Sequence, residues 1–552
     1  MSKKLVIIGG VAGGASAAAR ARRLDEQAQI IVFERDSFIS FANCGLPYHI
    51  GGDIKDRQAL LVQTPESMKA RFNLDIRIRS EVIDIDAANK EVVVKNLANG
   101  EEYRESYDDL ILSPGSSPIM PPIPGINSPG VFGLRNIPDM DHIIRFINAE
   151  VPKSALVVGG GYIGIEMAEA LIHRGLETTL VEMADQILSP LDVEMASPLH
   201  QEMRRNGVRM KLSNALTQID SKDGGLAVSF ANGDQEKYDL IIMATGVRPE
   251  TKLAKAAGCK LGETGSIWVN ERMQTSVPNV YAVGDAIEVT DLVSQLPAMI
   301  PLAGPANRQG RIAAEVIFGR DSQYKDTQGT AICKVFELQA ASTGSNEKQL
   351  RKAGVQFEKI YIHPQDHAGY YPGATQIHLK LLFDPQTGRI FGAQAVGKKG
   401  ADKRIDVLAM AIRAQLTVFD LEEQELCYAP PYGSAKDPVN QAGFVAANVV
   451  RGDSQVCHAN TIDECSPDSL LIDVRNPSEI GVLGSIDTAL NVPLPELRSR
   501  LSELPKDRTL VVFCAVGLRG YVAEQILRHN GFRVKNLSGG FTTWQMVKRQ
   551  GR

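Results

Sequence analysis

The apolar and polar positions near the N-terminus alternate between short buried strands and alanine-rich helices. The apolar run LVIIG starts at residue 5 and ends in glycine, the helical stretch ASAAARARRL follows, and IIVFE forms a second strand. The same strand–turn–helix–strand plan recurs over residues 155–182, as ALVVGGGYIGIEMAEALIHRGLETTLVE. This repeat predicts an α/β protein with two doubly wound dinucleotide-binding domains.

Three further segments are expected to carry the chain between these two domains. They are YDDLILSPGSSPIMPPIPG after residue 106, YDLIIMATGVRP at 238–249 and TSVPNVYAVGDA at 275–286. We therefore assign residues 1–113 and 246–330 to the first dinucleotide domain and residues 114–245, with the crossover, to the second.

The pattern changes after residue 330. Alternating strands with a DPQTG hairpin turn, followed by helices, predict a third, α+β domain over residues 331–450. The polar segment 451–464 is expected to be a linker. Residues 465–552, which open with SLLIDVRNPSE, predict a small α/β domain near the lower size limit for independent folding.

The composition is that of an ordinary globular protein, with 43% hydrophobic and 23% charged residues and a net charge of −5. This weak negative charge argues against general nucleic-acid binding. No stretch reaches the roughly 18 apolar residues that a membrane span needs, and the N-terminal apolar run meets its glycine turn too early for a signal peptide. Seven cysteines without a CxxC spacing predict neither a metal site nor a disulfide framework. We expect a cytoplasmic protein without membrane, nucleic-acid or metal partners.

The glycine turns of the two repeats are the first candidate binding sites. The second turn fits GxGxxG with Gly159, Gly161 and Gly164, while the first has Gly9 and Gly14 but Val11 in the middle. Such glycines let the backbone approach a pyrophosphate at a helix N-terminus. An acid ends the next strand in each repeat, Glu34 and Glu182. Glu182 can bind a ribose 2′-hydroxyl and repels a 2′-phosphate, which favours NADH over NADPH. Tight helix–sheet packing without a nucleotide is the alternative.

A single cysteine, Cys44, lies shortly after the first repeat in SFANCGLPY. Most lone cysteines are small buried hydrophobic residues, as we expect of Cys259, Cys333, Cys427 and Cys457. Cys44 instead begins a short predicted helix, whose N-terminus would lower the pKa of its thiol. No second cysteine lies between residues 1 and 258. A partner sulfur must therefore come from a bound thiol compound, or from oxidation of Cys44 itself.

Six motifs in order make residues 1 to about 450 resemble the single-cysteine class of the pyridine nucleotide-disulfide oxidoreductases, on the coenzyme A-disulfide reductase branch. They are VIIGGVAGG, ATGVRP, YAVGDA, PLAGPANRQGR, HAGYYPG and YAPPYGSAKDP, together with SFANCGLPY. The resemblance implies FAD in the first domain, NAD(P)H in the second and a homodimer formed by the third; the preference for NADH rests on Glu182. Beside the turn residues named above, the cofactor-binding positions expected are Arg35, Asn43, Pro114, Gly115, Gly246, Asp285 and Ala303.

The same resemblance implies two further sets of residues. Two tyrosines of the partner subunit approach the cysteine in that family, and Tyr370 and Tyr428 match them here, although ordinary interface or core packing is an alternative for both. Coenzyme A carries several phosphate charges and needs cations, for which Arg22 on the first helix is also available. The coenzyme A positions expected are Arg20, Arg23, Ser40, Arg71, Asn307 and Arg311; a solvated charged helix face is the alternative.

The last domain carries its own cysteine in VVFCAVGLRG. Backbone N–H groups that curl around the Cys514 sulfur above a helix N-terminus would stabilise a thiolate or persulfide. The loop from Cys514 to Arg519 resembles the rhodanese active loop CxxGxR. Ala515 stands where many thiosulfate-using members have Arg, and Gly520 where Ser is common, so thiosulfate is in doubt as the sulfur donor. An inactive rhodanese-like module is the alternative.

The sequence therefore predicts an NADH- and FAD-dependent reductase of coenzyme A persulfide, polysulfide or disulfide, fused to a rhodanese domain that handles sulfane sulfur. Two alternatives stay open. One is an NADH oxidase or peroxidase that cycles Cys44 through a sulfenic acid. The other is a sulfur carrier or sensor, in which Cys514 relays a persulfide to a partner protein and the flavin domain reports the redox state.

Overall fold

The computed structural model describes residues 2–222, 225–462 and 468–548. The chain forms two compact units, one of Met1–Met183 with Gly207–Gly329 and one of Ala184–Asn206 with Thr330–Arg552. The predicted boundary between the linker and the last domain, at residues 464 and 465, lies outside the described residues. Among the described residues, no helix is long and apolar enough to cross a membrane.

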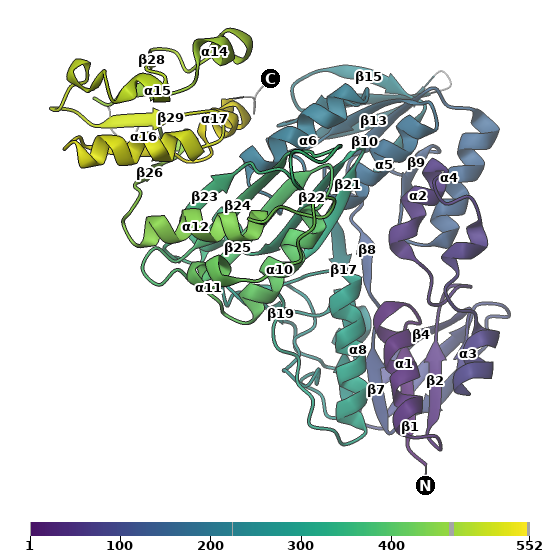
Figure 1. Ribbon diagram of the computed structural model, residues 1–552. Coiled ribbons are helices and arrows are strands. Elements are labelled where there is room, and N and C mark those ends of the chain that lie inside the picture. Colours follow the sequence, from purple (N-terminus) through teal and green to yellow (C-terminus); the bar gives the residue numbers. More distant parts are fainter. Residues whose placement is uncertain (1, 223–224, 463–467, 549–552) are drawn as a thin grey trace. The chain divides into compact units, whose positions relative to one another are not determined.

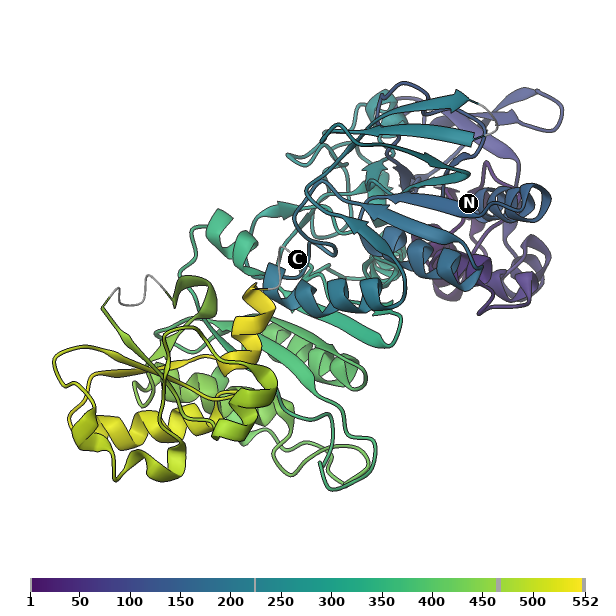
Figure 2. The same ribbon diagram turned by 90° about the horizontal axis from the view of Figure 1, so that it is seen from above.

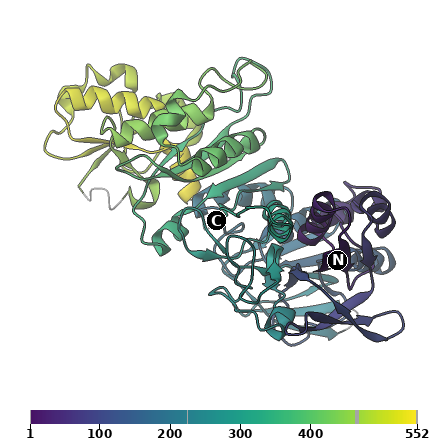
Figure 3. The same ribbon diagram turned by 90° about the horizontal axis from the view of Figure 1, so that it is seen from below.

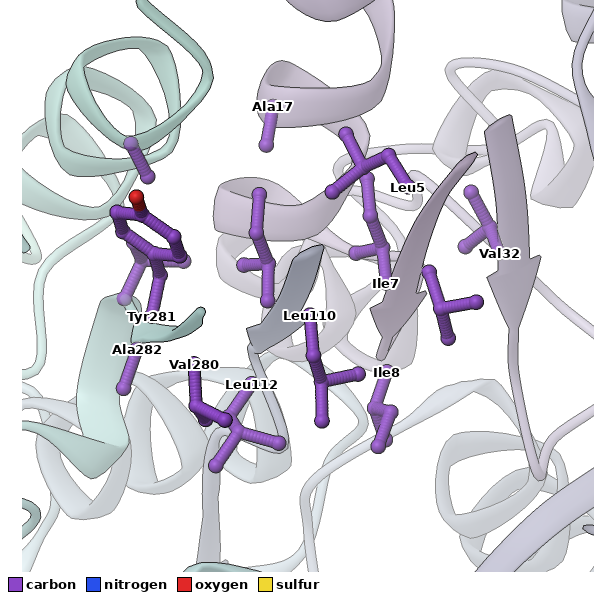
Figure 4. Packing of buried hydrophobic residues seen from close by; sticks show 14 of the residues in the cluster. Leu5, Ile7, Ile8, Ala17, Val32, Leu110, Leu112, Val280, Tyr281 and Ala282 are labelled. Carbon is purple, nitrogen blue, oxygen red and sulfur yellow. The ribbon is translucent and has the colours of Figure 1, made fainter. Parts of the chain in front are cut away.

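The first unit begins with a five-stranded parallel sheet whose central strands are almost wholly apolar, because both of their faces are buried. Figure 4 shows Leu5, Ile7 and Ile8 of its middle strand packed among the neighbouring strands. The strand order is β18 (Val280–Ala282), β7 (Asp109–Leu112), β1 (Lys4–Ile8), β2 (Gln29–Phe33) and β3 (Asp75–Arg77). An antiparallel sheet of β4 (Ser80–Asp86), β5 (Glu91–Asn96) and β6 (Glu102–Ser106) follows β3 along the chain.

Two long helices of this domain, α1 (Ala12–Leu24) and α8 (Ala303–Ile317), lie side by side (Figure 1) and are seen nearly end-on in Figure 3. Their backbones approach closely, since a Cβ added at Gly310 would lie 2.1 Å from the carbonyl oxygen of Gly13. The second stretch of this domain, which carries α8, is thereby held against α1, the helix that follows the first glycine turn.

The second dinucleotide domain repeats this plan within the same unit. Its parallel sheet has the order β12 (Arg209–Lys211), β11 (Glu177–Val181), β10 (Ser154–Val158), β16 (Leu240–Met243) and β9 (Val131–Gly133). The helices α4 (Ile137–Glu150) and α5 (Tyr162–His173) and the antiparallel strands β13 (Leu216–Lys222), β14 (Gly225–Phe230) and β15 (Gln235–Tyr238) complete it. β8 (Ser116–Pro118) pairs with β17 (Val247–Pro249) where the chain crosses between the domains. The predicted internal repeat of doubly wound folds is confirmed.

The second unit contains the predicted antiparallel sheet, in the order β21 (Ala331–Val335), β22 (Leu338–Gly344), β25 (Ile390–Gly397), β24 (Ile377–Phe383) and β23 (Glu358–Ile362). The DPQTG turn lies between β24 and β25, where Asp384 accepts the amides of Gln386 and Thr387 and Gly388 has a φ of +74°. The helices of the domain around this sheet are α9 (Glu347–Lys352), α10 (Ala401–Arg413), α11 (Val418–Glu423) and α12 (Pro438–Val450).

Residues 184–206, which the predicted boundaries give to the second dinucleotide domain, belong to this second unit. They contain α6 (Val193–Arg205). The Lys380 ammonium on β24 is fully buried and binds Asp192 at 2.7 Å and Glu194 at 2.5 Å, and it also binds Glu347 at 2.5 Å. A buried charge needs such partners, so this cluster fixes α6 to the sheet.

The last domain is also α/β, as predicted, and is coloured yellow in Figure 2. Its parallel sheet has the order β26 (Val456–Cys457), β30 (Val534–Leu537), β29 (Leu510–Phe513), β27 (Leu470–Asp473) and β28 (Leu490–Asn491). Alternate residues of β29 face different cores, Val512 with α16 (Leu518–His529) and Val511 with α17 (Gly540–Lys548). The short helices α14 (Pro477–Leu483) and α15 (Leu494–Leu497) lie between β27 and β29 in the sequence.

Candidate active site

The glycines of the two repeat turns fall into two physical classes. Gly9 and Gly159 have φ values of +98° and +109°, and Gly14 and Gly164 approach the carbonyl oxygens of Gly9 and Gly159 so closely that an added Cβ would lie 1.9 Å away. These four are required by the backbone. Gly161 differs, because an added Cβ would meet nothing within 4 Å. Its missing side chain leaves open space in front of the turn, as a pyrophosphate requires.

Both turns lead into helices whose first amides no side chain caps. The N-cap residues are Val11 for α1 and Gly161 for α5, and neither provides a side-chain hydrogen bond. Unsatisfied amides and the helix dipole together favour a bound anion. The residues present therefore fit the pyrophosphates of two dinucleotides.

The acids at the ends of β2 and β11 bind the turns themselves. Glu34 is buried and accepts the amides of Gly10 at 2.9 Å and Asp36 at 3.0 Å. Glu182 accepts the amide of Gly160 at 2.6 Å. Each carboxylate thus fixes the shape of its glycine turn and lies close to where a ribose would sit. Contact of these acids with ribose stays a prediction.

The other predicted cofactor positions surround the crossover. Arg135 donates to the carbonyl of Pro114 at 3.2 Å, and Gly115 and Gly246 have φ values of +70° and +100°. Asp285 accepts from Ser116 at 3.3 Å instead of capping its own turn, and burial raises its pKa. Of the remaining positions, Arg35 faces Glu250 at 3.8 Å, Asn43 is exposed and Ala303 begins α8.

Cys44 lies in a single 3₁₀ turn, Asn43–Gly45, directly before α2 (Leu46–Gly51). Its side chain is exposed, yet protein atoms surround the sulfur closely enough that burial raises the pKa of the thiol, and the carboxylates of Glu166 and Asp285 raise it further. The predicted lowering by the helix N-terminus is therefore wrong. The turn and helix are too short for a strong dipole, and two acids oppose the thiolate.

Glu166 and Tyr48 are site residues that the sequence prediction missed. The Tyr48 hydroxyl on α2 donates to Glu166 on α5 at 3.1 Å. Burial is the main cause that raises the pKa of Glu166, to about 7, followed by a smaller contribution of the same sign from Glu169. The signal in the sequence was an acid inside the otherwise apolar helical stretch IGIEMAEA.

The two predicted tyrosines are exposed and touch each other. Tyr370 and Tyr428 are 75% and 50% exposed, and their hydroxyl oxygens lie 3.0 Å apart. This bond raises the pKa of Tyr370, so its proton is retained. Exposure excludes the core-packing alternative for both rings. Tyr371 and Tyr432 are also exposed nearby in the sequence.

Only part of the predicted coenzyme A set is brought together. Arg20 on α1 and Arg311 on α8 share Glu315, and Asn307 accepts from Ser16 at 2.7 Å. Ser40 has a φ of +42°, Arg23 donates to its own helix at Ala19, and Arg71 lies 5.9 Å from the ring of Phe72. Arg22 is buried, and its guanidinium donates hydrogen bonds to four main-chain carbonyls, which gives it a structural role.

Cys514 directly follows β29, in a loop whose backbone donates a hydrogen bond to its sulfur. The thiol is buried, and the amide of Gly517 donates to Sγ at 3.2 Å, one residue before α16 begins. Gly517 has a φ of +109°, which a side chain would disfavour. The backbone of Phe541 binds the Cys514 carbonyl at 2.8 Å, so α17 supports the loop from behind.

Arg519, the cation of this loop, is bound by an acid that the sequence prediction missed. Its two terminal nitrogens lie 2.7 and 2.6 Å from the carboxylate oxygens of Glu479 on α14. This pair lowers the pKa of Glu479 to about 2. The structure also explains the glycine at position 520. A Cβ added there would lie 2.4 Å from the side-chain oxygen of Asn536.

The sequence matches three described families. Pyridine nucleotide-disulphide oxidoreductase matches residues 3–310, the dimerisation domain of the same family matches 330–438, and the rhodanese-like domain matches 456–546. The predicted domain boundaries differ from these ranges by several residues and stay predictions.

Known proteins match most or all of this chain. Coenzyme A disulfide reductase of Staphylococcus aureus is 40% identical over 444 residues, which cover 80% of this chain and 99% of that protein. The crystal structure of reduced CoADR-RHD of Bacillus anthracis is 50% identical, with a TM-score of 0.97 over 99% of this chain and 98% of that one. An NAD-dependent persulfide reductase from A. fulgidus is 38% identical, with a TM-score of 0.92 over 98% of this chain and 100% of that one. This chain therefore belongs to the pyridine nucleotide-disulphide oxidoreductase family and is a flavin-dependent oxidoreductase.

Proposed function

We propose that this protein uses NADH and FAD to reduce coenzyme A persulfide, polysulfide and disulfide through Cys44, while Cys514 of the rhodanese domain handles sulfane sulfur. The observation that carries the proposal is one exposed thiol among residues 1–258, combined with a second thiol held by a persulfide-type loop in the same chain. An enzyme that only reduced disulfides would have little chemical use for that loop.

Cys44 needs no second protein cysteine because its partner sulfur arrives on the substrate. Its thiolate attacks the sulfane sulfur of coenzyme A persulfide, a Cys44 persulfide forms, and the coenzyme A thiolate leaves. Two electrons and one proton then return Cys44 to the thiolate and release hydrogen sulfide. FAD, when bound, supplies the two electrons that it receives as hydride from NADH. Glu182 favours NADH over NADPH.

The tyrosine pair fits the role of proton donor to the leaving sulfur. Tyr370 and Tyr428 are exposed on the domain that matches the family's dimerisation domain. We propose a cytoplasmic homodimer in which this pair faces the partner's redox thiol. Arg20, Asn307 and Arg311 lie on the adjacent helices α1 and α8, which supports the proposal that they bind the phosphates of coenzyme A.

The test is anaerobic NADH oxidation with coenzyme A persulfide and, separately, coenzyme A disulfide, for the wild type and Cys44→Ser. Fast persulfide-dependent oxidation with hydrosulfide release, reduced at least about 1000-fold in Cys44→Ser, is the expected result because no other thiol replaces this nucleophile. Cys514→Ser should lower hydrosulfide release from polysulfide donors and leave disulfide reduction unchanged.

Other outcomes would identify a different enzyme. A clear preference for the disulfide would make the protein a coenzyme A-disulfide reductase with an accessory rhodanese domain. NADH oxidation under air without any thiol, lost in Cys44→Ser, would favour the oxidase with a sulfenic acid intermediate. Slow turnover of every small substrate, with tight binding to another protein, would favour the sulfur carrier.

A further inference from the structure

The two exposed tyrosines lie on separate loop segments of the domain that matches the family's dimerisation domain. Tyr370 lies in the first tyrosine segment, residues 366–371, and Tyr428 opens the second tyrosine segment, residues 428–437; both segments lie outside helices and strands. Cys427, directly before Tyr428, is exposed as well, so its predicted burial is wrong. The 3.0 Å contact between the two hydroxyl oxygens therefore needs support from outside the loops.

One buried side chain, Arg404 of α10, binds both tyrosine segments. Its Nη2 donates to the carbonyl of Asp366 in the first segment at 2.8 Å. Its Nε and Nη2 also donate to the carboxylate of Asp437, at 3.2 and 2.7 Å, at the end of the second segment. In addition, the amide of Ala368 donates to the carbonyl of Gly433 at 3.0 Å and joins the segments directly. The backbones that carry the two tyrosines are thus fixed to each other.

The surroundings of Arg404 leave its guanidinium one place to lie. Arg404 and Asp437 are each 2% exposed, and a bidentate pair between guanidinium and carboxylate is directional as well as strong. A Cβ added at Gly400, the N-cap of α10, would lie 2.3 Å from Nη1 of Arg404, so a glycine there leaves room for the guanidinium. Asp437 is fixed in turn, because it caps α12 by accepting the amide of Val439 at 3.1 Å.

The first segment has a second anchor on the side chain of the residue that Arg404 binds. One carboxylate oxygen of Asp366 accepts the amide of Thr375 at 2.6 Å, and the other lies 2.9 Å from Nδ1 of His367. Asp366 and His367 are both buried, whereas Tyr370 is 75% exposed. Buried contacts that begin four residues before Tyr370 therefore limit where its exposed ring can lie.

We propose that Arg404 is a positioning residue for the tyrosine pair, which it holds at the spacing where one hydroxyl donates to the leaving sulfur and the other aligns that donor. This inference rests on the proposed role of the pair as proton donor. Arg404 acts through the two segments, since its guanidinium is buried and binds protein groups. A shift of about 1 Å in a reacting group can cost about 100-fold in rate, so loss of this contact should be visible in turnover.

The first experiment is anaerobic NADH oxidation with coenzyme A persulfide by the cofactor-loaded Arg404→Lys enzyme. Lysine keeps the charge but cannot form the bidentate bond. The kcat should fall at least about tenfold, and KM should stay within about twofold, because the residues proposed to bind coenzyme A lie on α1 and α8. Arg451→Lys is the matched control and should change neither. Arg451 directly follows α12 and binds Glu422 of α11 through both terminal nitrogens, at 2.9 and 2.6 Å, but is exposed.

The second experiment separates positioning from a general loss of structure. In an enzyme that carries Tyr370→Phe and Tyr428→Phe, the hydroxyls that Arg404 positions are gone. Arg404→Lys should then change kcat by less than about twofold, because residues that act through one another are not additive. An equal fall in kcat with and without the hydroxyls would overturn the proposal.

The third measurement does not depend on turnover. The hydrogen bond with Tyr428 raises the pKa of Tyr370, so Arg404→Lys should let Tyr370 ionise at lower pH. The ultraviolet titration of each enzyme, minus that of its Tyr370→Phe counterpart, measures this shift. Asp437→Asn should give a smaller shift in the same direction and serves if Arg404→Lys folds poorly.

An unchanged Tyr370 titration in both variants would overturn the proposal. If Tyr370→Phe with Tyr428→Phe kept the turnover of the wild type, the proposed proton donor would fail, and the titration would still decide whether Arg404 positions the pair.

Discussion

The two cysteines that carry the proposed chemistry lie in opposite surroundings. Cys514 is buried, and its sulfur receives the amide of Gly517. The side chain of Cys44 is exposed, yet protein atoms packed around its sulfur raise the pKa of the thiol, and the acids Glu166 and Asp285 raise it further. The backbone around Cys514 therefore stabilises an anionic sulfur, whereas the surroundings of Cys44 disfavour its thiolate.

This difference corresponds to two different tasks. A sulfur carrier holds a persulfide between encounters, so a fixed amide beside a helix N-terminus suits it. A redox thiol changes its charge in every cycle, so a permanent stabiliser of the thiolate suits it less. The substitutions below test whether each environment serves the task assigned to it.

The largest effect on the Cys514 side is expected from Gly517→Ala. A side chain at a φ of +109° is strained, so the loop should rearrange and withdraw the amide from the sulfur. Sulfur transfer from Cys514 to cyanide should fall at least about tenfold, since one oriented backbone donor is lost. Reduction of coenzyme A disulfide through Cys44 should stay within about twofold.

Gly531→Ala is the matched control for that substitution. Gly531 also has a positive φ, +79°, in the same domain, and an added Cβ meets nothing within 4 Å. It should cost about 1 kcal/mol of stability and leave sulfur transfer unchanged. Equal losses in both variants would mean that the Gly517 amide has no special role.

A smaller, opposite effect is expected from Glu479→Gln. The Glu479 carboxylate neutralises Arg519, and its pKa of about 2 keeps it ionised at every working pH. Without that charge, Arg519 becomes a net cation beside Cys514, so thiosulfate-dependent sulfur transfer should rise about three- to tenfold. Steady-state assays with thiosulfate and with a neutral organic persulfide would measure it.

The exposed pair of Arg500 and Glu503 provides the control for this change. Glu503→Gln should alter neither donor. If Glu479→Gln leaves thiosulfate use unchanged, the small, uncharged Ala515 beside Cys514 limits the reaction instead.

The smallest effect is expected from a change of pH. Acid should loosen the surroundings of Cys514 and leave those of Cys44 unchanged. His363 binds His378 at 2.8 Å and Thr543 of α17 at 2.8 Å. Burial lowers the pKa of both histidines, that of His378 to about 4. The unfolded chain takes up protons near pH 6.5 and the folded chain does not, so stability is complete above pH 6.5 and falls as the pH drops toward 4.

Denaturant unfolding at pH 7 and pH 5 should show a loss of about 1–3 kcal/mol for the region around α17. The alkylation rate of Cys514 relative to that of Cys44 should rise from pH 7 to pH 5 as α17 loosens, although both rates fall with the thiolate fraction. His363→Gln should flatten this dependence. Equal stability at both pH values would contradict it.

Much of the fold could be predicted because its signals are local. Glycine turns after apolar runs located both dinucleotide repeats, and the DPQTG turn located a hairpin. The assignment of residues 184–206 could not be predicted, because Lys380 binds Asp192 and Glu194 across more than 180 residues of sequence. Pattern reasoning sees neighbours along the chain, and this cluster exists only in the folded unit.

The candidate site shows the same limit. Cys44 and Cys514 were found from their neighbours in sequence, but the pKa shift of Cys44 was predicted with the wrong sign. Its causes are burial of the sulfur in the folded chain and then Glu166, which is 122 residues away, and Asp285, which is 241 residues away. Glu479, which neutralises Arg519, was missed for the same reason.

The buried Lys380 cluster determines where this chain can be divided. A fragment that stopped before residue 330 would keep Asp192 and Glu194 but lose the ammonium that binds both of them. It would also lose Tyr361, whose hydroxyl donates to Glu194 at 2.7 Å. A fragment that stopped after α12 would keep every member of the cluster. The dinucleotide-binding half is therefore not a separable module, although its sequence pattern suggests one. The shortest fragment that keeps the cluster complete also includes the antiparallel sheet.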